Sequence, residues 1–168
     1  VQRLHASRPL RYGQQREPKK VLILVIASNR GLCGAFNANV IKSANNLIEK
    51  TYSHASKTGN LQLVTIGKKV TEYYQRKSIK ILGSYDHIFD NLTFENVAPL
   101  AESFMEAFAV KEFDRIIIVY NQFKNAVVQN LVNEQFLPVT PPAIIPAAKG
   151  VVPDYIFEPG KEEIVNEL

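Results

Sequence analysis

The amino-acid sequence predicts an α/β domain with a doubly wound, mostly parallel sheet of five strands and helices on both faces. Three observations lead to this fold class. Short apolar runs alternate with longer amphipathic segments, which is typical of strand–helix–strand units. The first run does not alternate in polarity, as expected for a strand that is covered on both faces. The last run follows its predecessor after a gap too short for a crossover helix, so it is expected to return antiparallel.

The strands are expected in the order 3-2-1-4-5, with the antiparallel strand at one edge. Each predicted strand is a short and largely apolar run. The five runs are residues 21–27, 61–66, 79–82, 115–120 and 126–136. The last of them does not alternate strictly, which predicts an edge strand with a bulge.

Three helices are expected between the strands, because apolar residues recur there at spacings of three and four. They cover residues 37–57, 68–76 and 94–111. Asn37 and Thr93 are expected to cap the starts of the first and last helix, and Gly59 is expected to stop the first. Residues 83–93 are expected to form a connection with weak strand character at residues 87–89.

Composition and length favour one globular domain within a longer protein. Of the 168 residues, 46% are hydrophobic and 21% are charged, which is ordinary for such a domain. Residues 1–20 are expected to hold the end of a helix and a linker, and residues 21–137 the α/β domain. Residues 138–159 are expected to form a proline-rich connection packed on the domain, and residues 160–168 the start of another helix. A single cysteine, Cys33, excludes an internal disulfide framework.

Charge is divided unevenly along the chain. Residues 1–80 hold 15 lysines and arginines against 3 acidic residues, whereas residues 81–168 hold 5 against 13. Two interpretations follow: the halves neutralise each other in the fold, or a basic surface faces an acidic partner such as nucleic acid, anionic lipid or an acidic protein loop. No recognised nucleic-acid-binding module accompanies the basic half.

The loop after the first strand is the candidate functional element. In doubly wound sheets, ligands bind beyond the carboxyl ends of the strands where the strand order reverses, here beside residues 28–34 and 121–124. The loop consists of Ser28, Asn29, Arg30, Gly31, Leu32, Cys33 and Gly34. It has only G-x-x-G and lacks both G-x-G-x-x-G and G-x-x-x-x-G-K-[ST], which disfavours a phosphate site. A small nucleotide-binding or hydrolase domain using this loop remains the alternative function.

Cys33 is a candidate nucleophile, since it precedes a helix and lies near Arg30. A cysteine hydrolase would also need a histidine base. His5, His54 and His87 lie in three separate segments, and none is placed by the sequence to reach the thiol. A structural role for Cys33 is therefore favoured, and no catalytic residue, metal ligand or cofactor is expected.

Residues 25–37, which contain S-N-R-G-L-C-G-A-F-N, resemble the hallmark segment of the gamma subunit of F-type ATP synthases, the central rotor stalk. The family usually has an aspartate at the position of Asn29, which puts any charge pairing there in doubt. The resemblance continues in order and spacing through residues 57–68, 113–124, 136–139 (F-L-P-V) and 155–159 (Y-I-F-E-P).

This resemblance implies a non-catalytic subunit, without a cofactor, that couples rotation of a proton- or sodium-driven ring to ATP synthesis. The implied partners are the catalytic and non-catalytic hexamer subunits, the epsilon-type stalk subunit and the membrane rotor ring, with no nucleic acid and no small-molecule ligand. Residues 28–34 are the candidate subunit-contact loop, with Arg30 facing acidic loops of the catalytic subunits. The long terminal helices of the family are missing from this sequence. A peripheral location is implied, on the cytoplasmic side of a bacterial plasma membrane rather than on the mitochondrial inner membrane.

Overall fold

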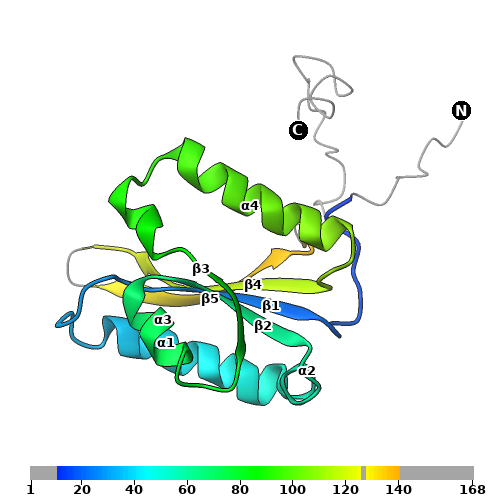
Figure 1. Ribbon diagram of the computed structural model, residues 1–168, viewed down its shortest axis with the longest axis horizontal. Helices are drawn as coiled ribbons and strands as arrows, with labels where there is room; N and C mark the ends of the chain where they lie inside the picture. The colour runs from blue at the N-terminus through cyan, green and yellow to red at the C-terminus, as the bar shows by residue number, and fades with distance from the viewer. Residues whose placement is uncertain (1–10, 126–127, 141–168) are drawn as a thin grey trace, which may run out of the picture.

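A five-stranded sheet with helices on both faces forms the domain in the computed structural model, which describes residues 11–125 and 128–140 (Figure 1). The strands are β1 (Val21–Ile26), β2 (Leu61–Ile66), β3 (Lys80–Ser84), β4 (Arg115–Phe123) and β5 (Gln129–Leu137). The helices are α1 (Phe36–Asn46), α2 (Ser53–Lys57), α3 (Lys68–Tyr74) and α4 (Phe94–Ala109), with a π-helical turn η1 (Leu47–Thr51) and a 3-10 helix η2 (Asp86–Asp90). No helix in these described ranges is long and apolar enough to cross a membrane.

The sheet has the order β3-β2-β1-β4-β5, which confirms the predicted order. Strand β1 pairs in parallel with β2 and β4, β2 pairs in parallel with β3, and β5 runs antiparallel to β4. Near the end of the hairpin, Ile116 lies opposite Leu137 and Ile117 opposite Gln135, so Phe136 is an extra residue on β5. The predicted antiparallel edge strand with a bulge is thus confirmed.

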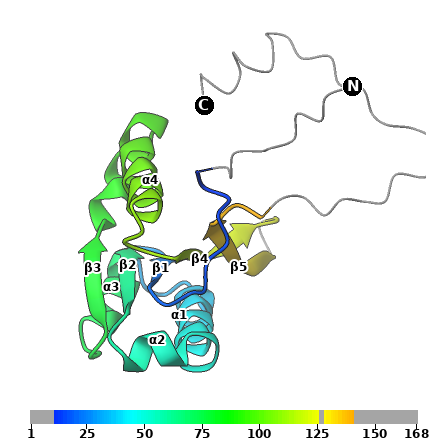
Figure 2. The same cartoon turned by 90° about the vertical axis from the view of Figure 1, so that its right-hand side faces the viewer.

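Two hydrophobic cores lie on opposite faces of the sheet, and β1 contributes to both. Val21, Ile23 and Val25 pack in the core beneath α1, α2 and α3, whereas Leu22 and Leu24 pack in the core beneath α4. Figure 2 shows α4 on one side of the sheet and α1, α2 and α3 on the other. This placement explains why the run does not alternate in polarity: both faces of the strand are buried, and each such side chain stabilises the fold by roughly 1.5–3 kcal/mol.

Some helix ends differ from the prediction. The segment predicted as one helix over residues 37–57 is interrupted after α1 by the π-helical turn and Tyr52, whose side chain is buried in the core. Ala35, not Asn37, occupies the cap position of α1. Thr93 does occupy the cap position of α4, but its side chain makes no capping hydrogen bond to the helix. Gly59, with φ +71°, follows α2.

The connection after β3 is helical and not strand-like. Residues 87–89 lie in η2, because the buried Ile88 packs in the core under α4 and the turn is closed by an Ile88 N–H to Tyr85 carbonyl bond of 3.2 Å. The expected end of a helix at residues 1–10, most of the expected connection at 138–159 and the expected helix at 160–168 lie outside the described residues.

Buried tyrosines predict a loss of stability at alkaline pH. Tyr74 has no exposed surface, and its hydroxyl lies 3.1 Å from Asn45 Oδ1. Burial raises the pKa of Tyr74, and that of Tyr52, above the ordinary tyrosine value of about 10. The folded state therefore holds these protons more tightly than the unfolded state. Stability is full below about pH 10 and falls as the pH rises above it, by up to about 1.4 kcal/mol per pH unit for each tyrosine.

Urea unfolding at a series of alkaline pH values will measure this slope. Tyr74→Phe removes one of the two protons and should make the decline shallower. An equal decline in the variant would contradict the assignment.

Candidate subunit-contact loop

Residues 28–34 leave the carboxyl end of β1, at the point between β1 and β4 where the strand order reverses. A pocket of about 220 Å³ opens beside the carboxyl ends of these two strands. It is lined by Ile26, Ala27, Ser28, Phe36, Phe89, Tyr120 and Asn121. This lining is largely apolar and carries no formal charge, so it offers no counter-charge to a phosphate group.

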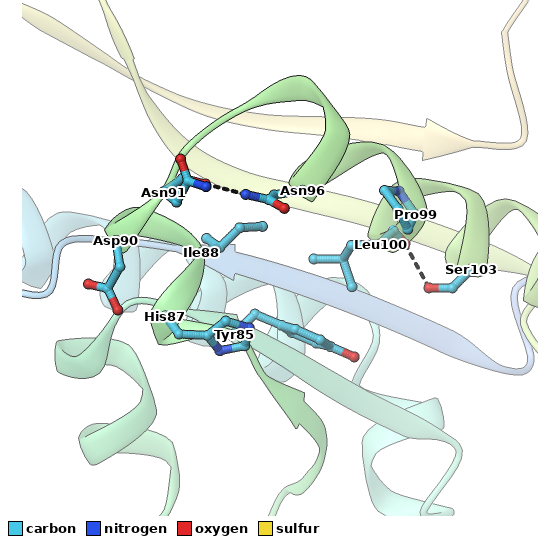
Figure 3. Close-up of a pocket in the computed structure, with 9 residues that line it drawn as sticks. All are labelled: Tyr85, His87, Ile88, Asp90, Asn91, Asn96, Pro99, Leu100 and Ser103. Atoms are coloured by element: carbon cyan, nitrogen blue, oxygen red, sulfur yellow. Dashed lines mark hydrogen bonds between the residues drawn. The ribbon is translucent and has the colours of Figure 1, made fainter.

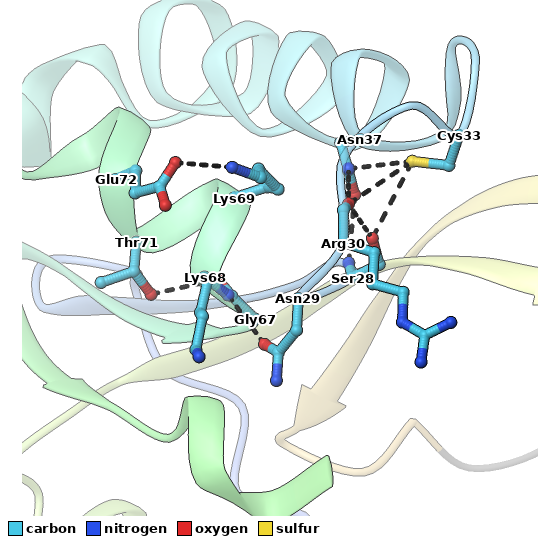
Figure 4. A network of polar contacts seen from close by, with 10 residues as sticks. All are labelled: Ser28, Asn29, Arg30, Cys33, Asn37, Gly67, Lys68, Lys69, Thr71 and Glu72. Carbon is cyan, nitrogen blue, oxygen red and sulfur yellow. Dashed lines mark hydrogen bonds and ion pairs between the residues drawn. The ribbon is translucent and has the colours of Figure 1, made fainter.

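The side chain of Asn37 holds the loop in shape (Figure 4). Its Oδ1 accepts a hydrogen bond from the Ser28 N–H at 3.0 Å, and its Nδ2 donates to the Arg30 carbonyl at 3.0 Å. Ser28 Oγ donates to the same carbonyl at 2.7 Å, and Cys33 Sγ lies 3.0 Å from Asn37 Nδ2. The residue that the sequence suggested as a helix cap therefore braces the loop instead.

Asn29 joins the loop to two neighbouring elements. Its Oδ1 accepts from the Lys68 N–H in the first turn of α3 at 2.9 Å, and its Nδ2 donates to the Asp86 carbonyl in η2 at 3.0 Å. An aspartate has no donor when ionised, so it could make only the first of these bonds. The amide at position 29 thus has a bridging role that the sequence did not reveal.

Asp86 and Gly67 complete the base of the loop. The Asp86 carboxylate accepts from the Gly67 N–H at 3.2 Å and from Thr71 Oγ1 at 2.8 Å. Gly67 has φ +113°, a conformation that residues with a side chain rarely adopt. None of these three residues was predicted as a site residue. The only signal was a glycine between a strand and a helix, since Asp86 comes from a distant segment.

Arg30 and Leu32 project from this braced loop into solvent. The Arg30 side chain points away from the network in Figure 4, and within the described residues it makes no hydrogen bond or ion pair. Leu32 is fully exposed and has φ +57°, which costs a non-glycine residue of order 1 kcal/mol. The loop therefore holds a cationic and an apolar side chain free for contact with another molecule.

Cys33 is exposed, and its sulfur makes polar contacts within the same loop and the start of α1. Sγ lies 3.8 Å from both Ser28 Oγ and the Arg30 carbonyl, in addition to its contact with Asn37. No histidine is among these contacts in the part of the chain that the structure describes. In the same part, no group of three or more histidine, cysteine, aspartate or glutamate residues is placed to hold a metal ion.

A larger pocket, of about 470 Å³, lies between η2 and α4 (Figure 3). Its lining residues are Tyr85, His87, Ile88, Asp90, Asn91, Asn96, Pro99, Leu100 and Ser103. Two of its polar side chains bind nearby backbone: Asn96 Nδ2 donates to the Asn91 carbonyl at 2.9 Å, and Ser103 Oγ donates to the Leu100 carbonyl at 2.7 Å. This pocket was not predicted from the sequence.

The fold and the loop together define a doubly wound α/β domain whose switch-point loop carries neither phosphate-binding fingerprint. Comparison with known proteins identifies the family to which this domain belongs. The family described as ATP synthase matches residues 1–168, and the chain belongs to the gamma chains of this family. The resemblance inferred from the loop is thereby confirmed.

Curated relatives include the ATP synthase gamma chains of Flavobacterium johnsoniae and Chloroherpeton thalassium. The first is 50% identical over 158 residues, covering 94% of this chain and 52% of the relative. The second is 36% identical over 160 residues, covering 90% and 53%. The chain thus spans about half the length of these relatives.

A solved structure, the central stalk and c-ring of the Tetrahymena thermophila mitochondrial ATP synthase, has the same fold. It matches with a TM-score of 0.57 at 21% identity, covering 92% of this chain and 64% of that one. A rotor of the Euglena gracilis mitochondrial ATP synthase matches with a TM-score of 0.51 at 20% identity, covering 83% of this chain and 49% of that one.

Proposed function

We propose that this domain is the α/β part of a non-catalytic central-stalk subunit, which couples rotation of a membrane ring to ATP synthesis in a catalytic hexamer. Family membership supports the class of function. One observation carries the mechanical role: the segments before and after the domain leave it side by side, since the Val139 N–H donates to the Tyr12 carbonyl at 2.7 Å. Two flanking helices that start from one place can pair antiparallel as a single shaft.

The partners in this proposal are the hexamer subunits, an epsilon-type stalk subunit and the membrane ring. The bacterial relatives support a peripheral place on the cytoplasmic side of the plasma membrane. In this arrangement residues 28–34 form the contact with the hexamer, and Arg30 faces an acidic loop there. The rigid bracing by Asn37 and Asn29 supports such a role, because a side chain on a fixed loop meets its partner with little loss of conformational entropy.

A rotation assay tests the function. The full-length subunit is assembled with the hexamer, and a probe is attached to α4 through Glu102→Cys in a Cys33→Ser background; Glu102 is exposed. During ATP hydrolysis we expect the probe to turn in one direction. A stationary probe on a hydrolysing complex would contradict the proposal.

The alternative function, a nucleotide-binding or hydrolase domain, has a separate test. Calorimetric titration of the subunit with ATP, ADP and NAD should show no micromolar binding, because the pocket at the end of β1 lacks cationic side chains. Micromolar binding that is lost when Ser28 is replaced by a bulky residue would favour the alternative.

Reversing the charge of Arg30 should impair coupling. With Arg30→Glu we expect ATP-driven ion pumping by the assembled complex to fall about fivefold, because an exposed ion pair contributes up to about 1 kcal/mol. Pumping is measured in proteoliposomes by quenching of a pH-sensitive dye, or by sodium uptake if sodium is the coupling ion.

Lys57→Glu is the matched control for this prediction. It makes the same charge change at an exposed lysine next to the amino end of β2, on the opposite edge of the sheet from the loop. Equal losses in the two variants would show a general charge effect and would refute a specific contact at Arg30.

A further inference from the structure

Residues 11–20, which lead into β1, lie against the C-terminal end of α4 (Figure 1). They contain no regular helix or strand, yet they are fixed at several points to parts of the chain about 90 or more residues away. Since this segment joins the domain to whatever precedes it, its attachment decides how firmly the domain follows that preceding part.

Arg16 is the centre of this attachment. Its Nη2 donates to the Phe108 carbonyl, in the last turn of α4, at 2.8 Å. The guanidinium carbon lies 4.1 Å from the centroid of the Phe108 ring, and Nη1 lies 3.7 Å from Asp114 Oδ1. The Arg16 and Asp114 side chains are only 14% and 16% exposed. One planar group thus engages a helix C-terminus, an aromatic face and a carboxylate, which suits the flat guanidinium of arginine better than the compact ammonium of lysine.

Asp114 connects Arg16 to the start of two central strands. Its Oδ2 accepts from the Lys20 N–H at 2.9 Å, and its own N–H donates to the Lys20 carbonyl at 2.8 Å. Lys20 directly precedes β1, and Asp114 directly precedes β4. At the other end of the segment, Tyr12 packs against the core under α4, and its carbonyl accepts from Val139. Arg16 therefore lies midway between two anchored ends.

Stability alone does not explain why this arginine is buried. Its Nε and Nη1 are inaccessible and have no hydrogen-bond partner among the described residues, and the 3.7 Å contact of Nη1 with Asp114 is an ion pair without a hydrogen bond. Burying a charged guanidinium whose N–H donors are only partly hydrogen-bonded costs desolvation free energy. Buried ion pairs are also often no more stabilising than apolar side chains of similar size. What the arrangement does supply is a fixed geometry between the incoming segment and α4.

Building on the proposed rotor function, we propose that Arg16 is a positioning residue that clamps the incoming segment to the end of α4. The α/β domain then cannot turn relative to the shaft, and torque passes directly between the two. The exposed ion pair of Arg11 with Glu106, in which both side chains are more than half exposed, lies on the same segment and adds little to this clamp.

The clamp is tested in the rotating complex by following angular fluctuations of a probe on α4. In the stalled complex, Arg16→Ala should increase the mean-square angular fluctuation about twofold or more, because the domain gains freedom relative to the shaft. Arg16→Lys keeps the positive charge but loses the planar guanidinium, and it should increase the angular fluctuation by an intermediate amount. A probe on the shaft itself should be unaffected, as should the rate of ATP hydrolysis.

Arg11→Ala is the matched control and should leave the fluctuation as in the unaltered subunit. Wild-type fluctuation in both Arg16 variants would overturn the inference. A probe that never rotates in the unaltered complex would instead refute the rotor function.

Hydrogen exchange of the Val139 amide then tests the clamp independently of rotation. It should be faster in both Arg16 variants of the full-length subunit than in the Arg11 variant. Equal exchange would also overturn the inference.

Discussion

Gly67→Ala is expected to lower the free energy of unfolding by about 3–5 kcal/mol, at the top of the range for single substitutions. A Cβ at this position would lie 2.2 Å from the Ala27 carbonyl oxygen and 2.7 Å from its carbon. Both atoms belong to the backbone at the end of β1, so neither can move without displacing the base of the loop. The φ of +113° adds strain of its own. Urea unfolding of the subunit, followed by circular dichroism, measures the loss.

Gly59→Ala separates the two causes. Gly59 also has positive φ, at +71°, but within the described residues no atom beyond its chain neighbours lies within 4 Å of the point that a Cβ would occupy there. Only the backbone penalty of about 1 kcal/mol should remain. If the two variants were equally destabilised, the close approach of Gly67 to Ala27 would not be the reason.

Phe108→Ala is expected to lower the free energy of unfolding by about 3–5 kcal/mol, the usual range for removing a buried phenylalanine. Phe108 has no exposed surface and fills the core between α4 and the sheet. Its ring also lies beneath the guanidinium of Arg16, so the variant loses that contact as well. The midpoint of chemical denaturation measures this effect.

Phe94→Ala provides a matched comparison on the same helix. Phe94 begins α4, and 81% of its surface is exposed. We expect the free energy of unfolding of the Phe94→Ala variant to stay within about 0.5 kcal/mol of that of the unaltered protein. A large loss for Phe94, or a small one for Phe108, would contradict the assignment of the core to the C-terminal half of α4.

The sheet topology was predictable because it depends on local and statistical properties of the chain. The unbroken run at residues 21–27 showed a strand buried on both faces, and β1 does pack in two cores. The short gap after Tyr120 excluded a crossover helix, and β5 is antiparallel. The loop at residues 28–34 was recognisable for the same reason, since its distinctive residues are contiguous.

The bracing of that loop was not predictable. Asn37 stood where a helix cap is expected, and only the position of the loop carbonyls made it a brace. Asn29 meets Lys68 and Asp86, which come from two other segments of the chain. Local sequence patterns do not predict such contacts, because the contacts depend on how separate elements pack against each other.

The fold class, the strand order and the family of this protein follow from the sequence alone, because apolar periodicity, connection length and a contiguous motif depend only on the order of the residues. Which polar side chains act together depends on the packed structure. Arg16 and Phe108 are 92 residues apart, and their contact exists only because β1 and β4 are neighbours in the sheet and α4 ends above them. A hydrogen bond or a stacked ring requires atoms within a few ångströms of each other, and only the packed fold sets that distance.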